Sequence, residues 1–203
     1  MGVTAPRRLG AADSKTRERL LDAAERLLLD EGYAAVTSRR VAAEAELKPQ
    51  LVHYYFRAMD DLFLEVYRRR AAQSIERFTR AMDVHRSLRT MWRFGADLGG
   101  AAFNVEFAAL GNHRKAIRDE IGHWARRYRE LQLDAVTAIL GDLGISPEAF
   151  PPVVVLLGLT GVTQVMAIEE ALGVTDGHRE TLAFVDAWID RTEHAPSPGP
   201  PQA

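Results

Sequence analysis

Apolar residues recur at helical spacing along almost the whole chain, from Asp13 to Glu193. No stretch alternates apolar and polar residues for long enough to be a half-buried strand, whereas positions three and four apart repeatedly carry aliphatic or aromatic side chains. The pattern therefore predicts an all-α protein. Separate helices are expected over residues 14–32, 37–45, 49–56, 59–82, 86–99, 101–112, 113–143, 150–172 and 178–192.

The first three expected helices have the layout of a helix-turn-helix domain. Ser14 is a residue type that caps helix N-termini, and Gly32 suits a helix end. Two short helices follow, joined by the three residues before Pro49, which itself suits a first helical position. We predict a flexible basic arm (1–12), a helix-turn-helix DNA-binding domain (13–57), a helical ligand-binding and dimerisation domain (58–194) and a disordered Pro-rich tail (195–203).

The second short helix is expected to have two different faces. Its inward positions, at i, i+3, i+4 and i+7, are Val52, Tyr55, Phe56 and Met59. A helix that exposes a glutamine, a histidine, a tyrosine and flanking cations, without an acid, suits contacts with phosphates and base edges. The other interpretation is an ordinary solvated face. The outward positions are Lys48, Gln50, Leu51, His53, Tyr54 and Arg57.

These residues resemble the DNA-binding signature of TetR-family transcriptional repressors. The resemblance rests on residues 37–45, 47, 51–56 and 60–63, and it extends over about residues 14–65. It implies an all-helical homodimer in which each subunit carries one helix-turn-helix domain and a C-terminal domain that binds a small molecule and releases DNA. The DNA-binding residues implied by the resemblance are Thr37, Ser38, Arg39, Lys48, Pro49, Gln50, Leu51, His53, Tyr54 and Arg57.

Three residues depart from the pattern of that family. Glu46 stands where the family usually has a glycine, so we expect a non-glycine residue in the left-handed conformation and an acid near the phosphates. Lys48 replaces a usual serine, which exchanges a helix cap for a cation. Met59 replaces a lysine that usually holds phosphate, and Arg57 is the expected substitute.

Composition and charge narrow the function further. The chain has no cysteine, which excludes disulfides, thiolate metal sites and cysteine nucleophiles. Residues 1–70 hold 13 Lys and Arg against 11 Asp and Glu, whereas the whole chain has a net charge of −2, so the N-terminal part is the more basic one and suits a polyanion. Because no apolar run precedes Leu20, we expect no secretory signal and a cytoplasmic protein.

The segment 151–168 contains no charged residue and is long enough to span a membrane. Its prolines, glycines and polar residues argue against a span, so we expect a soluble helix with one face in the domain core. Another face, with the helix at 178–192, is predicted to form a four-helix dimer interface; the alternative is a helix buried within its own chain. The expected interface residues are Val155, Leu159, Val162, Leu182, Val185, Trp188 and Ile189.

Aromatic and thioether side chains in the C-terminal domain are typical of the lining of a small apolar ligand site. Their alternative role is to pack in the core. Glu106 and Gln164 are the polar candidates that would orient a ligand by hydrogen bonding. The expected ligand-binding residues are Met91, Phe94, Phe103, Glu106, Phe107, Leu110, Trp124, Tyr128, Thr163, Gln164 and Met166.

The strongest enzyme hypothesis rests on Glu120 and His123, which have the Glu-x-x-His spacing of di-iron helix bundles. Such a site needs a second copy of the motif, and the chain has none. We therefore expect no metal, no cofactor and no enzymatic activity. The expected partners are an operator in double-stranded DNA, a second copy of the chain and a small, largely apolar effector. The alternatives left open are a helical-bundle metal-binding or carrier protein with a regulator-like N-terminus, and a structural dimerisation module.

Overall fold

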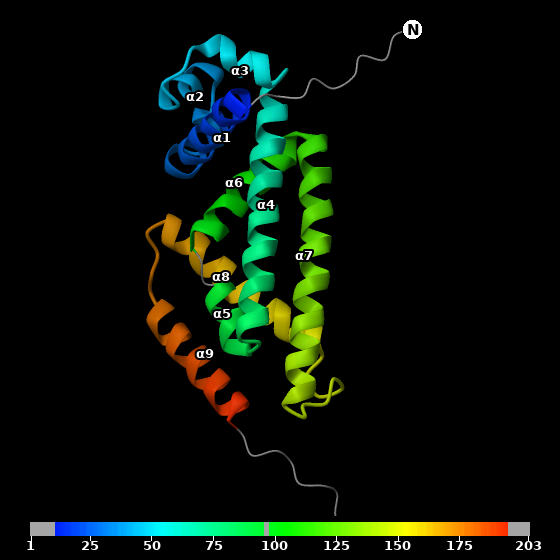
Figure 1. Cartoon of the computed structure of the whole chain (residues 1–203). Coiled ribbons are helices and arrows are strands. Elements are labelled where there is room, and N and C mark those ends of the chain that lie inside the picture. Colours follow the sequence, from blue (N-terminus) through cyan, green and yellow to red (C-terminus); the bar gives the residue numbers. More distant parts are fainter. Residues whose placement is uncertain (1–10, 96–97, 195–203) are drawn as a thin grey trace, which may run out of the picture. The chain divides into compact units, whose positions relative to one another are not determined.

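The computed structural model describes residues 11–95 and 98–194 of the 203-residue chain. Within those ranges the chain forms nine α-helices and one 3₁₀ helix, and it contains no strand (Figure 1). The all-α prediction is confirmed. The helices are α1 (Ala11–Glu31), η1 (Tyr33–Ala35), α2 (Ser38–Glu44), α3 (Pro49–Tyr55), α4 (Met59–Val84), α5 (Leu88–Gly95), α6 (Leu98–His113), α7 (Lys115–Asp142), α8 (Pro152–Ala171) and α9 (His178–Glu193).

Most helix limits lie within a few residues of the predicted ones. α1 begins at Ala11 rather than near Ser14, and Ala11 and Ala12 are strong helix formers that extend it. The sequence pattern does not predict η1, because a single 3₁₀ turn has no apolar periodicity. The predicted helix at 86–99 ends at Gly95. Residues 1–10 and 195–203, which include most of the predicted arm and the whole predicted tail, lie outside the described residues.

The chain divides into two compact units. Unit 1 comprises residues 1–70 and 106–120, and unit 2 comprises residues 71–105 and 121–203. Helices α4, α6 and α7 contribute residues to both units. The division therefore differs from a single boundary near residue 57, because long helices continue from one unit into the other.

Unit 1 contains the helix-turn-helix, in which α1 packs on α2 and α2 packs on α3. Further along the unit, the Phe107 ring of α6 lies 4.9 Å from the Tyr67 ring and 6.4 Å from the Phe63 ring of α4. Each fully buried large apolar side chain contributes about 1.5–3 kcal/mol to the free energy of unfolding. The buried side chains of α1, α2 and α3 are Leu20, Leu21, Ala23, Ala24, Leu27, Leu28, Val41, Ala42 and Val52.

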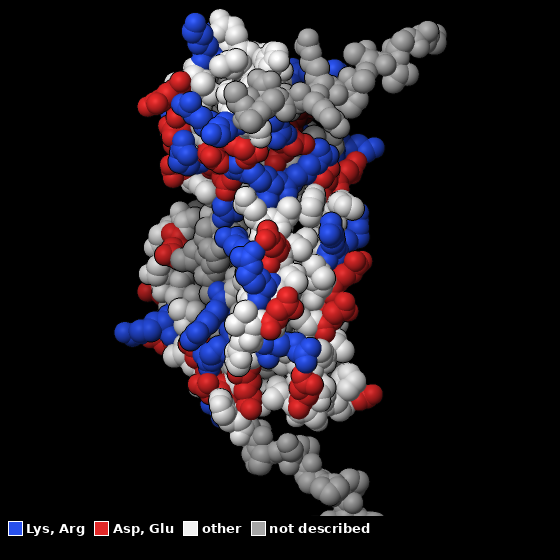
Figure 2. Space-filling model, viewed as in Figure 1, with Lys and Arg blue, Asp and Glu red and all other residues white. Residues whose placement is uncertain are grey.

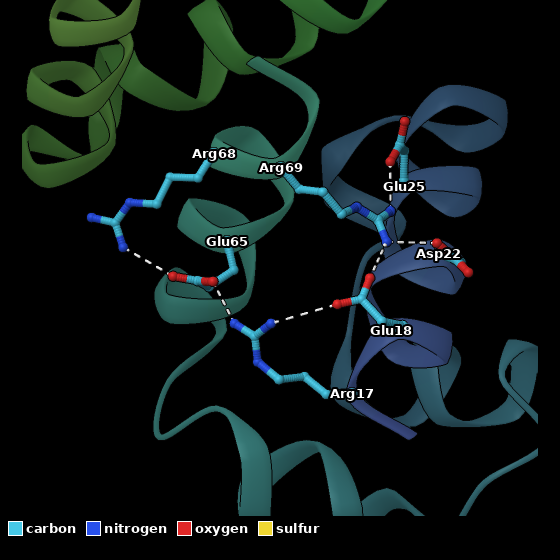
Figure 3. Close-up of polar contacts among 7 residues, drawn as sticks. All are labelled: Arg17, Glu18, Asp22, Glu25, Glu65, Arg68 and Arg69. Carbon is cyan, nitrogen blue, oxygen red and sulfur yellow. Dashed lines mark hydrogen bonds and ion pairs between the residues drawn. The ribbon is translucent and has the colours of Figure 1, made fainter. Parts of the chain in front are cut away.

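A cluster of ion pairs joins α1 to α4 within unit 1 (Figure 3). Glu18, Asp22 and Glu25 lie at i, i+4 and i+7 of α1, so their carboxylates share one face of the helix. All three accept hydrogen bonds from the guanidinium of Arg69, at 3.1, 2.6 and 2.7 Å. Because leaving a partly buried charge unpaired is costly, this arrangement fixes the register of α1 against α4.

Unit 2 has a core of its own, built from the end of α4 and from α5, α7, α8 and α9. The Phe78 ring lies 5.4 Å from the rings of both Phe94 and Tyr128, in edge-to-face contact. Burial raises the pKa of Tyr128 above its ordinary value. Arg89 of α5 donates to Asp186 and Asp190 of α9, at 2.6 Å each, which ties these two helices together at the surface of the unit.

Candidate nucleic-acid interface

The hydroxyl of Thr37 caps α2. Thr37 has extended backbone angles, and its Oγ1 accepts a hydrogen bond of 3.4 Å from the backbone N–H of Arg40. Thr37 and Arg39 are exposed, and Ser38 is half-buried. The sequence thus places two hydroxyls and a cation together at the beginning of this helix.

Two neighbouring arginines of α2 have different surroundings. Arg40 donates two hydrogen bonds of 2.5 Å to the carboxylate of Glu31, the last residue of α1, and these bonds raise the pKa of Arg40. Arg39 is exposed and forms no ion pair within the described residues. Arg40 therefore joins α1 to α2, whereas the guanidinium of Arg39 remains available for a phosphate.

The turn between α2 and α3 is closed by backbone hydrogen bonds. Glu46 has a φ of 53°, so the expected left-handed conformation is confirmed. The N–H of Glu46 donates to the carbonyl of Ala43 at 3.0 Å and that of Leu47 donates to Ala42 at 2.8 Å, which satisfies carbonyls at the end of α2. A non-glycine residue in this conformation costs about 1 kcal/mol. The Glu46 carboxylate lies 3.9 Å from the guanidinium of Arg19.

The two predicted faces of α3 are confirmed by burial. Val52 and Phe56 are buried, and Tyr55 and Met59 are half-buried. Lys48, at the N-cap position, provides no side-chain cap, as expected for a cation in place of a serine. Leu51 is only half-buried, so part of its side chain stays on the outward face. The exposed outward residues are Lys48, Pro49, Gln50, His53, Tyr54 and Arg57.

The exposed face of α2 and α3 differs in charge from the surroundings of the ion-pair cluster. Arg39, Lys48 and Arg57 form no ion pair within residues 11–95 and 98–194, so their charges are not neutralised by a neighbouring carboxylate. Figure 2 shows that acidic and basic side chains are otherwise interspersed over much of the visible face. Cations without carboxylate partners, beside a glutamine and a histidine that can hydrogen-bond, form a surface able to contact phosphates and base edges.

The predicted ligand-binding set does not come together in one unit. Glu106, Phe107 and Leu110 belong to unit 1 and the other eight residues to unit 2. The Glu106 carboxylate accepts a hydrogen bond of 2.9 Å from the backbone N–H of Tyr33, beside Gly32, whose φ is 80°. The Glu106 carboxylate therefore holds the turn after α1, and its part in a ligand site stays a prediction. Helical periodicity shows that Phe103, Glu106, Phe107 and Leu110 share a side of α6, but not which element that side meets.

The remaining members have several different surroundings. Phe107 and Leu110 are buried in unit 1, and Phe103 is buried in unit 2. Met91, Phe94 and Tyr128 pack in or against the core cluster of unit 2. The hydroxyl of Thr163 donates to the carbonyl of Thr160 at 3.0 Å, within its own helix. Trp124 lies beneath the guanidinium of Arg127, at 5.5 Å, and Gln164 and Met166 are half-buried.

Three of the seven predicted interface residues of α8 and α9 are buried, three are partly buried and one is exposed. Val155, Leu159 and Ile189 are buried in the core of unit 2, and Val162, Val185 and Trp188 pack against it. Only Leu182 belongs to the exposed class. This corrects the assignment of the helix faces: in a helix that is apolar all round, hydropathy cannot tell the inner face from the outer one. The exposed apolar residues of α8 are Val153, Val154, Leu157, Val165 and Ile168.

Two groups of residues were missed, and only the first has a signal in the sequence. Val154, Leu157, Gly161, Val165 and Ile168 repeat at intervals of three and four, which is the spacing of a helix-packing face. Glu31 and Arg40 are nine positions apart and carry no such signal. The expected Glu-x-x-His motif also has another role in part, because both oxygens of Glu120 accept hydrogen bonds from Arg68, at 2.9 and 2.8 Å.

Comparison with known proteins relates the chain to regulators of transcription. Residues 20–66 match the profile of the N-terminal domain described as "Bacterial regulatory proteins, tetR family". This stretch includes most of α1 and all of α2 and α3. The comparison with curated proteins finds no match.

Solved structures match over nearly the full described length. A putative transcriptional regulator from Saccharomonospora viridis, in complex with choline, superimposes with a TM-score of 0.71 at 19% identity over 90% of this chain and 97% of that one. A putative TetR-family regulator from Rhodococcus sp. gives 0.67 at 15% identity, over 87% and 98%. The fatty acid degradation regulator FadR from Bacillus halodurans gives 0.64 at 12% identity, over 93% and 98%. At these identities, the likeness establishes the fold.

Proposed function

We propose that this chain is a repressor that binds a pseudo-palindromic operator as a dimer. It carries the N-terminal domain of the tetR family of bacterial regulatory proteins and has the fold of TetR-family transcriptional regulators. A small, largely apolar ligand would release it from DNA. The observation that carries the proposal is the exposed side of α3, with Gln50, His53 and Tyr54 between the unpaired cations Lys48 and Arg57.

Each side chain on this face has a distinct proposed contact. Arg39, Lys48 and Arg57 bind phosphates, and the hydroxyls of Thr37 and Tyr54 add hydrogen bonds to the DNA backbone. Gln50 and His53 read base edges in the major groove, and Leu51 contacts a thymine methyl group or a sugar. Most of the affinity then comes from phosphates, whereas the choice of sequence depends on two or three side chains.

Dimerisation is supported by the exposed apolar face of α8. Val154, Leu157 and Val165 are 61%, 47% and 54% exposed, although a soluble chain normally covers such a contiguous surface. Gly158 and Gly161 lie in the same helix, and a Cβ added at either would have no atom from another described part of the chain within 4 Å. Each glycine costs a helix about 1 kcal/mol relative to alanine. Close approach of a second copy accounts for both features, together with the exposed Phe184 of α9.

The same face explains why α8 passes the composition test for a membrane span. α8 is the one helix within the described residues that is long and apolar enough, yet its most apolar window is only 22% buried. The Glu169 and Glu170 pair near its end and the lack of a similar helix in that part of the chain favour a protein interface over a lipid-facing one. We propose a cytoplasmic protein.

The ligand site is proposed for unit 2, among Met91, Phe94 and Tyr128. These side chains pack with Phe78 into an aromatic cluster at the core of the unit. Aromatic rings and a thioether can rearrange around an apolar or quaternary ammonium ligand. Release from DNA requires that the ligand bind the DNA-free conformation more tightly than the DNA-bound one. Choline, present in the Saccharomonospora viridis structure, is the first compound to test.

Substitutions on α3 separate the two kinds of contact. Replacing Tyr54 with alanine is expected to weaken binding to every duplex by a similar factor, because it removes a contact with the DNA backbone. Gln50→Ala and His53→Ala are expected to reduce the preference for the selected site over other duplexes, by about 1–3 kcal/mol per lost base contact. Competition titrations against the selected and scrambled duplexes measure both effects. An equal loss on all duplexes for all three variants would contradict the assignment.

A further inference from the structure

A continuous series of ion-paired side chains runs across unit 1 from α7 to α1. The carboxylate of Glu120 accepts two hydrogen bonds from Arg68 of α4, at 2.9 and 2.8 Å. Arg68 also donates to Glu65 at 3.0 Å, and the other oxygen of Glu65 accepts a hydrogen bond from Arg17 of α1. Figure 3 shows the part of this series from Arg68 through Glu65 to Arg17.

This series of ion pairs ends on α3, the helix proposed to enter DNA. The guanidinium carbon of Arg17 lies 5.5 Å from the centre of the Phe56 ring, in cation–π contact. Phe56 is the C-cap of α3; it is buried, and its N–H donates to the carbonyl of Val52 at 2.8 Å. The position of Arg17 therefore bears directly on the end of α3.

The two carboxylates are partly shielded from water, and Glu65 lies between two arginines. Glu120 is 18% exposed and Glu65 is 32% exposed. Burial alone would raise the pKa of Glu65, but hydrogen bonds from Arg17 and Arg68 outweigh it and hold the pKa below its ordinary value. The hydrogen bonds that Arg68 donates to the carboxylates of Glu120 and Glu65 raise the pKa of Arg68. Two-pronged contacts of this kind fix geometry as well as charge.

We propose that Glu120 is a positioning residue for DNA recognition, which acts on α3 through Arg68, Glu65 and Arg17 without touching DNA. The inference rests on the proposed function for its effect on DNA binding. Glu120 fixes the guanidinium of Arg68, Arg68 fixes Glu65, and Glu65 holds Arg17 against Phe56. Loss of the first member loosens the last, so the exposed side of α3 samples more orientations and meets the major groove less often in the productive one.

The sign of the effect distinguishes this role from simple electrostatics. Glu120→Gln removes one negative charge, and a change in net charge alone would strengthen binding to a polyanion. Positioning predicts the opposite. Glu76→Gln is the matched control: it makes the same change in charge on α4, in an exposed ion pair with Arg80 at 2.6 Å that is not connected to the cluster.

The test measures affinity for the duplex that the wild-type chain selects from a randomised library. Glu120→Gln is expected to lower that affinity about fivefold relative to Glu76→Gln, with unchanged far-UV circular dichroism. The effect of Glu120→Gln is expected to disappear in an Arg17→Gln background, because the contact of Arg17 with Phe56 is then already lost. If Glu120→Gln does not fold, Arg68→Lys replaces it, since a lysine keeps the charge but cannot form both pairs of contacts.

Hydrogen exchange in the free protein provides a measurement that does not depend on DNA. The amide of Phe56 is expected to exchange faster in Glu120→Gln than in the wild type, and at the wild-type rate in Glu76→Gln. Equal affinities of the two single variants, additive losses in the double variant, or an unchanged Phe56 amide would each overturn the proposal. A wild-type chain that selects no duplex would instead contradict the proposed function, and the exchange rates would still decide the role of Glu120.

Discussion

A chain in which Leu157 and Val165 are both replaced by glutamate is expected to fold but to remain monomeric, and to bind its operator at least about 100-fold more weakly. Both side chains lie on the exposed apolar face of α8, in the same helix as Gly158 and Gly161, where no other described part of the chain occupies the space beside the glycine. A carboxylate buried between two copies without a partner costs several kcal/mol, and each subunit would bring two. A monomer holds one recognition helix and can occupy only one half-site.

Multi-angle light scattering reports the oligomeric state, and titration of the selected duplex reports the affinity. Val84→Glu is the control, because Val84 is an 82% exposed apolar residue at the end of α4 and does not belong to the exposed apolar face of α8. This variant is expected to stay dimeric and to bind as the wild type does. A double variant that remains a dimer would place the interface elsewhere, and a monomeric variant with full affinity would show that dimerisation does not contribute to DNA binding.

The unpaired cations of the helix-turn-helix are expected to account for most of the salt dependence. Replacing Arg39, Lys48 and Arg57 by alanine removes three phosphate contacts per subunit, or six per dimer. The slope of log K against log salt concentration is expected to become shallower by about 5, with a loss of affinity on the order of 1000-fold at low salt. Titrations at four or more salt concentrations measure both quantities.

Three paired arginines supply the control for this experiment. Arg26, Arg40 and Arg80 each donate to a carboxylate, of Glu44, Glu31 and Glu76 respectively. Their replacement by alanine changes the net charge by the same amount, but it removes no cation available for phosphate. The salt slope of this variant is expected to stay close to that of the wild type. Equal slopes in the two triple variants would mean that net charge, rather than contacts on α2 and α3, determines the affinity.

Local sequence carries the information that assigns the two faces of α3. Val52 and Phe56 lie four positions apart, and the outward positions, apart from Leu51, are mostly polar or charged, so helical periodicity separates the inward from the outward side. The left-handed conformation of Glu46 is expected from the resemblance to the TetR family, which usually has a glycine at this position. In α8, periodicity does not separate the two faces, because the buried Val155 and Leu159 and the exposed Val154 and Leu157 are equally apolar. Only the packing of unit 2 distinguishes them.

The rest of the site could not be predicted from the sequence, because it depends on contacts between segments that are far apart along the chain. Nothing near Glu106 in the sequence indicates that it holds the N–H of Tyr33, 73 positions away. Arg39 and Arg40 are equivalent in sequence, and the position of Glu31 at the end of α1 makes one of them structural. The series of ion pairs from Glu120 to Arg17 depends on the packing of three helices, α7, α4 and α1, in one register. Periodicity identifies the elements and their faces, whereas pairing across helices depends on the folded arrangement.

Protection of guanine N7 from dimethyl sulfate, on the selected duplex, tests the central claim most directly, because this atom lies in the major groove. The account predicts two clusters of protected guanines whose centres lie about one helical turn apart, one for each α3 of a dimer. It also predicts that both clusters disappear when Gln50, His53 and Tyr54 are replaced together by alanine. Absence of major-groove protection, or protection that survives in that triple variant, would contradict the claim that the exposed side of α3 enters DNA.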